Sequence, residues 1–376
     1  MMRTWRDSFP YYPLLPLGAL VGFAWANIAA DSYFRVAQAL AFPVNDIGVA
    51  FGLATLALEV LEATGPGGTM PSWRHTVLAA AMGVGGAVAA AAMYAMYVHA
   101  ADEQVLAQGW PIVCGVDVFF GVAIARGIFR RGATVSLVVI LALVSDVVAL
   151  SAISRERIVA SADPAAALLI LGALVVSMLF RSFGVRSMWT YLLVAGPLSW
   201  LGFYWAGLHP ALALLPLVPF FPRAGRPLGD FAAHRHDLAS LTHFESALAY
   251  PLQAVALLFG LTNAGVLWRG FDTGTWAVLV ACLVGRPLGI LLAASAAALW
   301  GLRPNRYVRW SELTVAAFIG SVGAVFALFL STTVFPDGPL LAETKLGAIA
   351  TLAGVPLAYI AARALQVGRF VRGEHA

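Results

Sequence analysis

Stretches of about 20 mainly apolar residues recur along almost the whole chain, and this feature restricts the possible folds more than any other. Each stretch is long enough to cross a bilayer core of about 30 Å as a helix. Of the 376 residues, 61% are hydrophobic and 11% are charged, whereas roughly a quarter are charged in soluble domains. The sequence therefore predicts an all-α polytopic membrane protein, and it excludes a disordered, collagenous or disulfide-stapled chain.

We predict twelve membrane spans, which form a single integral membrane domain over residues 1–376. The first span lacks a small-residue cleavage site, so it is not interpreted as a signal peptide. The longest polar stretch, 223–243, is expected to be a cytoplasmic loop. The predicted spans cover roughly 14–30, 44–61, 76–99, 110–125, 133–153, 165–180, 188–206, 210–221, 247–268, 276–300, 313–334 and 341–366.

The distribution of basic residues predicts the orientation, because positive side chains are retained on the cytoplasmic side. With both termini in the cytoplasm, seventeen of the 23 Lys and Arg residues lie inside and five outside, and Arg286 lies within a span. The net charge of +4 is therefore explained by topology, and we expect no nucleic-acid partner. The one lysine, Lys345, is assigned to the outer face, which would exclude a buried lysine as proton carrier.

Three charged residues are predicted to lie deep within spans: Asp117, Asp146 and Arg286. A charge at such a depth costs at least about 2.5 kcal/mol on insertion scales, so each is a functional candidate. At 1.5 Å rise per residue, Asp117 lies about 12 to 14 Å from either face, Asp146 about 20 Å from the cytoplasmic face and Arg286 about 15 Å from the outer face. This similar depth would let them share one cavity near the membrane midplane.

Two spans carry residues that favour an interrupted helix. One contains Pro111 and Gly115 just before Asp117, and the other contains Gly320, Ser321 and Gly323. Proline lacks an amide donor and glycine destabilises a helix by about 1 kcal/mol. One broken helix in each half of the chain indicates an inverted-repeat transporter, although packing of small residues is an alternative explanation.

Structural roles remain open for several polar residues. Asp146 and Arg286 could form a buried salt bridge that only fixes helix packing, and Asp117 could simply be hydrogen-bonded to backbone. Solvation is expected for the residues near span ends, Asp46, Glu59, His99 and His209, and for those in the cytoplasmic loop, His234, His236 and His243. The cysteines, Cys114 and Cys282, are expected to be buried free thiols.

A series of short motifs follows in order along the chain. They are Ala26-Asn27, Asn45-Asp46, Leu58-Glu59, Gly109-Trp110 with Asp117 and Phe120, Leu141-Ala142 with Ser145-Asp146, Gly207-x-His209, Asn263-Ala264-Gly265-Val266, Gly285-Arg286-Pro287-Leu288-Gly289 and Gly320-x-x-Gly323. Their order and spacing resemble those of the NhaA sodium/proton antiporters along nearly the whole chain.

The resemblance implies an inverted-repeat antiporter of ten to twelve helices, in which two discontinuous helices cross at the membrane midplane. Sodium or lithium ions and protons would compete for carboxylates there. The expected role is pH homeostasis at a bacterial inner membrane. Asp146 matches the family's ion-binding and proton-carrying aspartate, and Asp117 matches the aspartate that compensates the dipoles of the broken helices. Na⁺, Li⁺ and H⁺ would be the substrates, with no cofactor and with a homodimer left open.

The chain also departs from the family pattern. Ser145 replaces the first aspartate of a pair, Val116 replaces a threonine, and Arg286 replaces a lysine. Glu59 matches a residue of a family stretch that is tied to pH response, although the neighbouring residues differ. The outer loop after Asn27 is short, which argues against the β-hairpin that pairs some family dimers.

These departures alter the expected mechanism. Burial disfavours the charged form of a carboxyl group, so Asp146 could hold either a proton or a cation. Ser145 adds no charge and Arg286 stays protonated, so we expect about one proton per cation. The exchange would take place at Asp146, and Asp117 would be a secondary ligand of the transported Na⁺ and proton site or a partner of the helix dipoles. A guanidinium paired with Asp146 would instead occupy the cation site. The alternatives are therefore a divergent carrier for another ion or solute, or a transport-inactive membrane scaffold; no enzyme motif is present.

Overall fold

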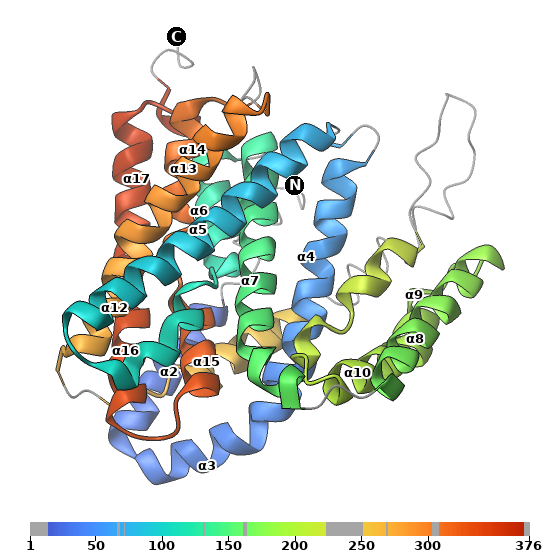
Figure 1. Ribbon diagram of the computed structural model, residues 1–376, viewed down its shortest axis with the longest axis horizontal. Coiled ribbons are helices and arrows are strands. Elements are labelled where there is room, and N and C mark those ends of the chain that lie inside the picture. The colour runs from blue at the N-terminus through green and yellow to red at the C-terminus, as the bar shows by residue number, and fades with distance from the viewer. Residues whose placement is uncertain are drawn as a thin grey trace, which may run out of the picture.

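The computed structural model describes residues 14–65, 68–70, 72–130, 132–160, 164–222, 251–267, 270–302 and 308–371, with only the backbone of 155–160. The loop predicted at 223–243, with His234, His236 and His243, lies outside the described residues. All long elements in the described part are helices (Figure 1).

Short 3-10 or π segments, labelled η, interrupt several of the helices. The first half contains α2 (Leu14–Ile28), α3 (Ala30–Ala41), η1 (Phe42–Gly48), α4 (Val49–Thr64), α5 (Trp73–Ala100), η2 (Gln104–Val113), α6 (Val118–Phe129), α7 (Ala133–Ala160), α8 (Pro164–Ser182), α9 (Met188–Thr190), η3 (Tyr191–Ala195), α10 (Gly196–Trp205), η4 (Pro210–Leu212) and η5 (Leu215–Phe220). The second half contains the helix Pro251–Asn263, then α12 (Thr273–Val280), η6 (Ala281–Gly285), α13 (Arg286–Leu299), α14 (Trp310–Ile319), α15 (Ala324–Val334), α16 (Pro339–Ala350), η7 (Thr351–Ala353), α17 (Gly354–Ala364) and η8 (Gly368–Phe370).

Six helices in the described part are long and apolar enough to cross a membrane, and two bent helix pairs raise this number to eight. Shorter apolar helices cover Leu14–Ile28, Pro210–Phe220 and Pro251–Asn263. These findings support a multi-pass helical membrane protein, while the count of twelve spans and the orientation remain predictions.

Helix α3 is an element that the sequence reading did not predict. It begins only two residues after α2 ends, and it lies across the lower end of the molecule in Figure 1. Its buried residues, Tyr33 and Ala37, lie one turn apart, while Asp31 and Arg35 are exposed. This amphipathic spacing gives a helix that packs along one side only. Because the segment also contains charged residues, it was interpreted from the sequence as a short loop. A helix thus occupies the place where some relatives were expected to carry a β-hairpin.

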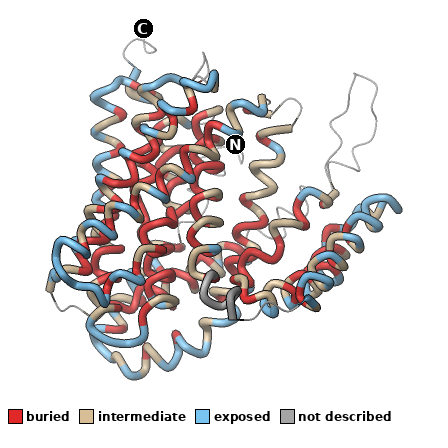
Figure 2. Tube along the Cα trace, in the orientation of Figure 1, coloured by how far each residue is buried: buried red, intermediate tan, exposed pale blue. Residues whose placement is uncertain are grey.

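The most deeply buried residues lie where α5, α7, α13 and the two bent pairs pack together (Figure 2). Small residues allow these helices to approach closely. A Cβ atom added at Gly85 would lie 3.0 Å from the carbonyl oxygen of Gly289, and one at Gly83 would lie 2.6 Å from that of Leu141. Helices α8 and α10 pair with each other at the opposite side, beyond α4 (Figure 1).

Candidate functional site

Two helix breaks meet in the interior of the molecule. The helix axes of η2 and α6 differ by 48° across residues 114–117, and those of α14 and α15 by 47° across residues 320–323. The Asp117 amide donates to the Val322 carbonyl at 2.9 Å. A Cβ atom at Gly115 would lie 2.5 Å from the Phe326 ring, so glycine is needed there for the two breaks to touch. Both interruptions were predicted from the sequence.

Asp117 is 1% exposed and caps the two helices that begin after the breaks. Its Oδ1 accepts from the Phe120 amide of α6 at 3.1 Å. Its Oδ2 accepts from the Val325 and Phe326 amides of α15 at 2.9 and 3.3 Å. The first amides of a helix lack partners within the helix and carry partial positive charge. Both carboxylate oxygens are therefore engaged with helix N-termini.

Asp146, on α7, is 0% exposed and has one engaged oxygen. Its Oδ1 accepts from the Val116 amide at 2.8 Å, so residue 116 contributes its backbone although its side chain is apolar. Within the described residues, Asp146 Oδ2 has no hydrogen-bond partner. A buried acceptor without a donor is costly, which makes this oxygen the best candidate to hold a proton or a cation.

Arg286 is 0% exposed and lies at the start of α13. Its Nη1 donates to the carbonyl oxygens of Gly115 at 2.6 Å and Gly320 at 3.1 Å, and its Nη2 donates to that of Val113. The Val113 and Gly320 carbonyls lie at the C-terminal ends of η2 and α14, where partial negative charge accumulates, and the Gly115 carbonyl lies within the first break. Among the described residues, no ion pair joins Arg286 to Asp146, so the suggested buried salt bridge is not what the structure shows.

The remaining predicted site residues have separate roles. Ser145 Oγ donates to the Gly83 carbonyl of α5 at 3.1 Å. The Gly320 carbonyl accepts from Arg286, and the Gly323 amide donates to Thr351 Oγ1 at 3.1 Å. Thr351 was not singled out from the sequence, because a lone threonine in an apolar span has no distinguishing motif.

Glu59 lies apart from this group, near the end of α4. It forms an ion pair with Arg126 of α6 at 2.7 Å, with about 40% of the Glu59 side chain exposed. The pair joins α4 to α6, and the suggested role of Glu59 in pH sensing stays a prediction.

The expectation that the one lysine is not buried is wrong, while the side of the membrane on which Lys345 lies stays a prediction. Lys345 is 3% exposed, and its Nζ donates to the Gly265 carbonyl at 3.1 Å. Helix α16 begins at Pro339 and packs against α12, so position 345 lies more than a turn into a packed helix. A buried lysine is therefore present, although it contacts Gly265 and not the carboxylates at the breaks.

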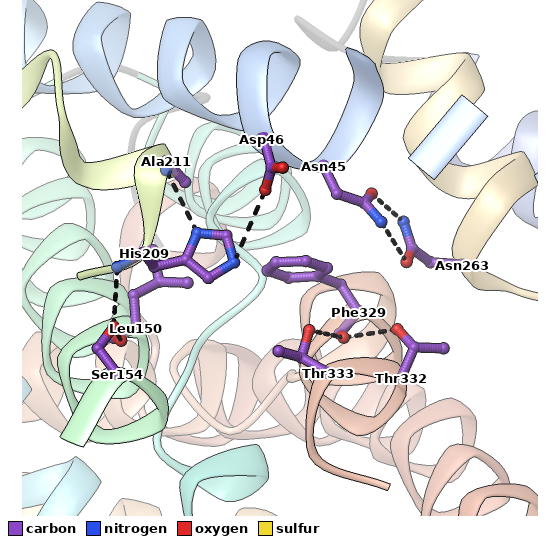
Figure 3. A network of polar contacts seen from close by, with 10 residues as sticks. All are labelled: Asn45, Asp46, Leu150, Ser154, His209, Ala211, Asn263, Phe329, Thr332 and Thr333. Atoms are coloured by element: carbon purple, nitrogen blue, oxygen red, sulfur yellow. Dashed lines mark hydrogen bonds and ion pairs between the residues drawn. The ribbon is translucent and has the colours of Figure 1, made fainter. Parts of the chain in front are cut away.

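Asp46 and His209 are also more than solvated span-end residues. His209 is 6% exposed, and its Nε2 lies 4.0 Å from Asp46 Oδ1. Figure 3 shows their side chains directed toward each other, with the reciprocal amide pair Asn45 and Asn263 beside them. The His209 amide donates to Ser154 Oγ at 2.8 Å. The sequence indicated this network only through the Gly207-x-His209 motif, which does not identify the residues that His209 contacts.

Comparison with known proteins gives a consistent match. Residues 16–365 match the sequence model of the family described as Na+/H+ antiporter 1. The Na(+)/H(+) antiporter NhaA of Desulfitobacterium hafniense (strain DSM 10664 / DCB-2) is 33% identical over 367 residues, covering 94% of each chain. The proteins of that name from Geobacter metallireducens and Jannaschia sp. (strain CCS1) are 30% and 32% identical, and cover 94% and 98% of this chain and 95% and 99% of their own.

Proposed function

This chain belongs to the Na+/H+ antiporter 1 family, and from that premise we propose that it exchanges Na⁺ or Li⁺ for protons by alternating access, with cation and proton competing for Asp146. Family membership confirms the resemblance to NhaA antiporters noted from the motifs. It also makes the chain a multi-pass member of a transporter family and not an enzyme.

The observation that carries the proposal is the free oxygen of Asp146. This Oδ2 is buried and has no hydrogen-bond partner among the described residues, while Oδ1 is held by the Val116 amide. A carboxylate held on one side and open on the other can bind a proton or a metal ion, but not both at the same oxygen. That mutual exclusion is the requirement for exchange.

Asp117 has a different role in this proposal. Three backbone amides already occupy its two oxygens, so it acts as the partner of the helix N-termini rather than as the main cation ligand. Its negative charge also favours a cation at the neighbouring Asp146.

Arg286 and Ser145 support a lower proton count than a site with two aspartates and a lysine would have. Arg286 donates to backbone carbonyls, and a guanidinium does not act as a proton carrier as a lysine amine can. Ser145 carries no ionisable proton in this range and donates to Gly83. With Asp146 as the one titrating group, the exchange moves about one proton per cation. Because Arg286 points to carbonyls, it does not fill the cation position at Asp146.

The chain as a whole acts as one membrane unit. Residues 1–376 form one integral domain in a bacterial inner membrane, with twelve spans and both termini in the cytoplasm. The asymmetry of seventeen basic residues against five supports this orientation. Association into a homodimer is left open.

Cation-dependent proton flux in inverted membrane vesicles tests the function. We expect Na⁺ and Li⁺, but not K⁺, to drive proton release in the neutral to mildly alkaline range. Asp146→Asn should abolish this flux, while Asp31→Asn, at an exposed position on α3, should leave it unchanged. Absence of Na⁺- and Li⁺-driven flux in the unmodified protein would contradict the proposal, and full flux in Asp146→Asn would contradict the site assignment.

A further inference from the structure

Thr351 is a buried polar residue at an irregular point of the last helical span. It is 0% exposed and begins η7, the short segment between α16 and α17. Its Oγ1 donates to the Ala348 carbonyl at 2.6 Å. Because a hydroxyl has only one hydrogen, this bond turns the lone pairs of Oγ1 toward other donors.

The donors that Thr351 Oγ1 accepts from belong to the second helix break. The Gly323 amide lies 3.1 Å away and the Ala324 amide 2.9 Å away. The next two amides, those of Val325 and Phe326, donate to Asp117. The four amides at the start of α15 are thus divided between a threonine from the last span and an aspartate from the first break.

Backbone conformation at this point depends on such external partners. Ala324 has a φ of 30°, a left-handed value that is unfavourable for a residue with a Cβ atom. The break is also tightly packed, since a Cβ atom at Gly354 would lie 2.5 Å from Ser321 Oγ. The last span therefore holds the second break both by hydrogen bonds and by close packing.

A short chain of contacts leads from Thr351 to the proposed ion site. Gly323 follows Val322, whose carbonyl accepts from the Asp117 amide at 2.9 Å. Asp117 follows Val116, whose amide donates to Asp146. A shift of residues 322–324 would therefore displace the amide that orients Asp146.

We propose that Thr351 is a positioning residue for the antiport reaction, because its hydroxyl caps α15 and thereby holds the second break against Asp117. This inference rests on the proposed function of the Asp146 site. Without the hydroxyl, the buried amides of Gly323 and Ala324 lose their acceptor, and an unsatisfied buried donor favours rearrangement. Thr351 acts through the break and does not bind the transported ion.

The test compares Thr351→Val, which removes the acceptor with little change in volume, with Thr351→Ser, which retains it. Thr344→Val is the matched control: Thr344 is equally buried on α16, but its hydroxyl donates only to the Leu340 and Leu341 carbonyls of its own helix. The measurement is the Na⁺ dependence of proton flux in proteoliposomes at fixed pH. We expect Thr351→Val to raise the half-saturating Na⁺ concentration about tenfold, with a smaller effect on the maximal rate.

The half-saturating Na⁺ concentrations of Thr351→Ser and Thr344→Val should stay within about twofold of that of the unmodified protein. Thr351→Ser retains the hydroxyl that caps α15, and Thr344→Val leaves that hydroxyl unchanged. Equal half-saturation in Thr351→Val and the unmodified protein would overturn the inference, as would equal losses in Thr351→Val and Thr344→Val. If Thr351→Val does not fold, Thr351→Cys replaces it, because a thiol is a weak acceptor; half-saturation as in the unmodified protein would again overturn the inference. If the unmodified protein shows no cation-dependent flux, it is the proposed function that fails.

Discussion

Asp117 and Arg286 have opposite tasks at the same two helix breaks. Asp117 accepts from amides at the N-termini of α6 and α15, and Arg286 donates to the Val113 and Gly320 carbonyls at the ends of η2 and α14. Each charge thus meets the partial charge of opposite sign at helix ends. At the scale of residues, these two charges compensate the helix ends, and Asp146 is left with an open oxygen.

Removing the guanidinium should therefore destabilise the protein. We expect Arg286→Gln to lower the free energy of unfolding by about 3 kcal/mol, because buried carbonyls lose their donors. Arg286→Lys should lower the free energy of unfolding by less, because lysine keeps the positive charge although it lacks the forked geometry of the guanidinium. Thermal unfolding of the purified protein measures this, with Arg363→Gln, at an exposed position of α17, as control. Equal melting temperatures for Arg286→Gln and the control would contradict this account of Arg286.

At the scale of elements, the site depends on how closely the breaks and helices approach one another. Glycine makes the contact possible where a side chain would collide, as at Gly115 against Phe326. Side chains from other helices also hold the end of the helix Pro251–Asn263. The Tyr33 hydroxyl donates to the Leu261 and Thr262 carbonyls, and Lys345 Nζ donates to the Gly265 carbonyl just beyond the helix. Irregular segments are thus held in place by side chains from other helices.

A paired glycine substitution separates close packing from helix propensity. Gly115→Ala should destabilise the protein by about 1 to 3 kcal/mol through overpacking against Phe326, and it should reduce cation-dependent flux. In Gly121→Ala, on α6, the new Cβ has its nearest neighbour at 3.7 Å, so that variant should be neutral or more stable by up to about 1 kcal/mol. Denaturation and flux assays on both variants check the prediction, which fails if Gly115→Ala behaves like Gly121→Ala.

At the scale of the whole molecule, the lower proton count has an electrical consequence. Exchange of one proton for one Na⁺ moves no net charge, so the membrane potential should not drive it. Each uncompensated charge would instead be worth about 2.3 kcal/mol per 100 mV. We expect the flux rate to stay constant when the potential across proteoliposomes is clamped at zero or at either sign.

The variant Ser145→Asp provides a comparison in the same assay. It adds a second titratable carboxyl group beside Asp146, and if both groups exchange protons, its flux should become sensitive to the membrane potential. Strong voltage dependence in the unmodified protein would contradict a one-to-one exchange.

The apolar spans, the two breaks and the three deep charges could be predicted from the sequence, because each depends on local properties: hydrophobicity over about 20 residues, glycine and proline content, and the cost of burying a charge. The partners of those charges could not. Arg286 meets a carbonyl 171 residues away and Asp117 an amide 208 residues away, and hydrogen bonds over such separations are decided by helix packing. Only the tertiary structure placed Arg286 on carbonyls instead of on Asp146, buried Lys345, and brought Thr351 to the start of α15.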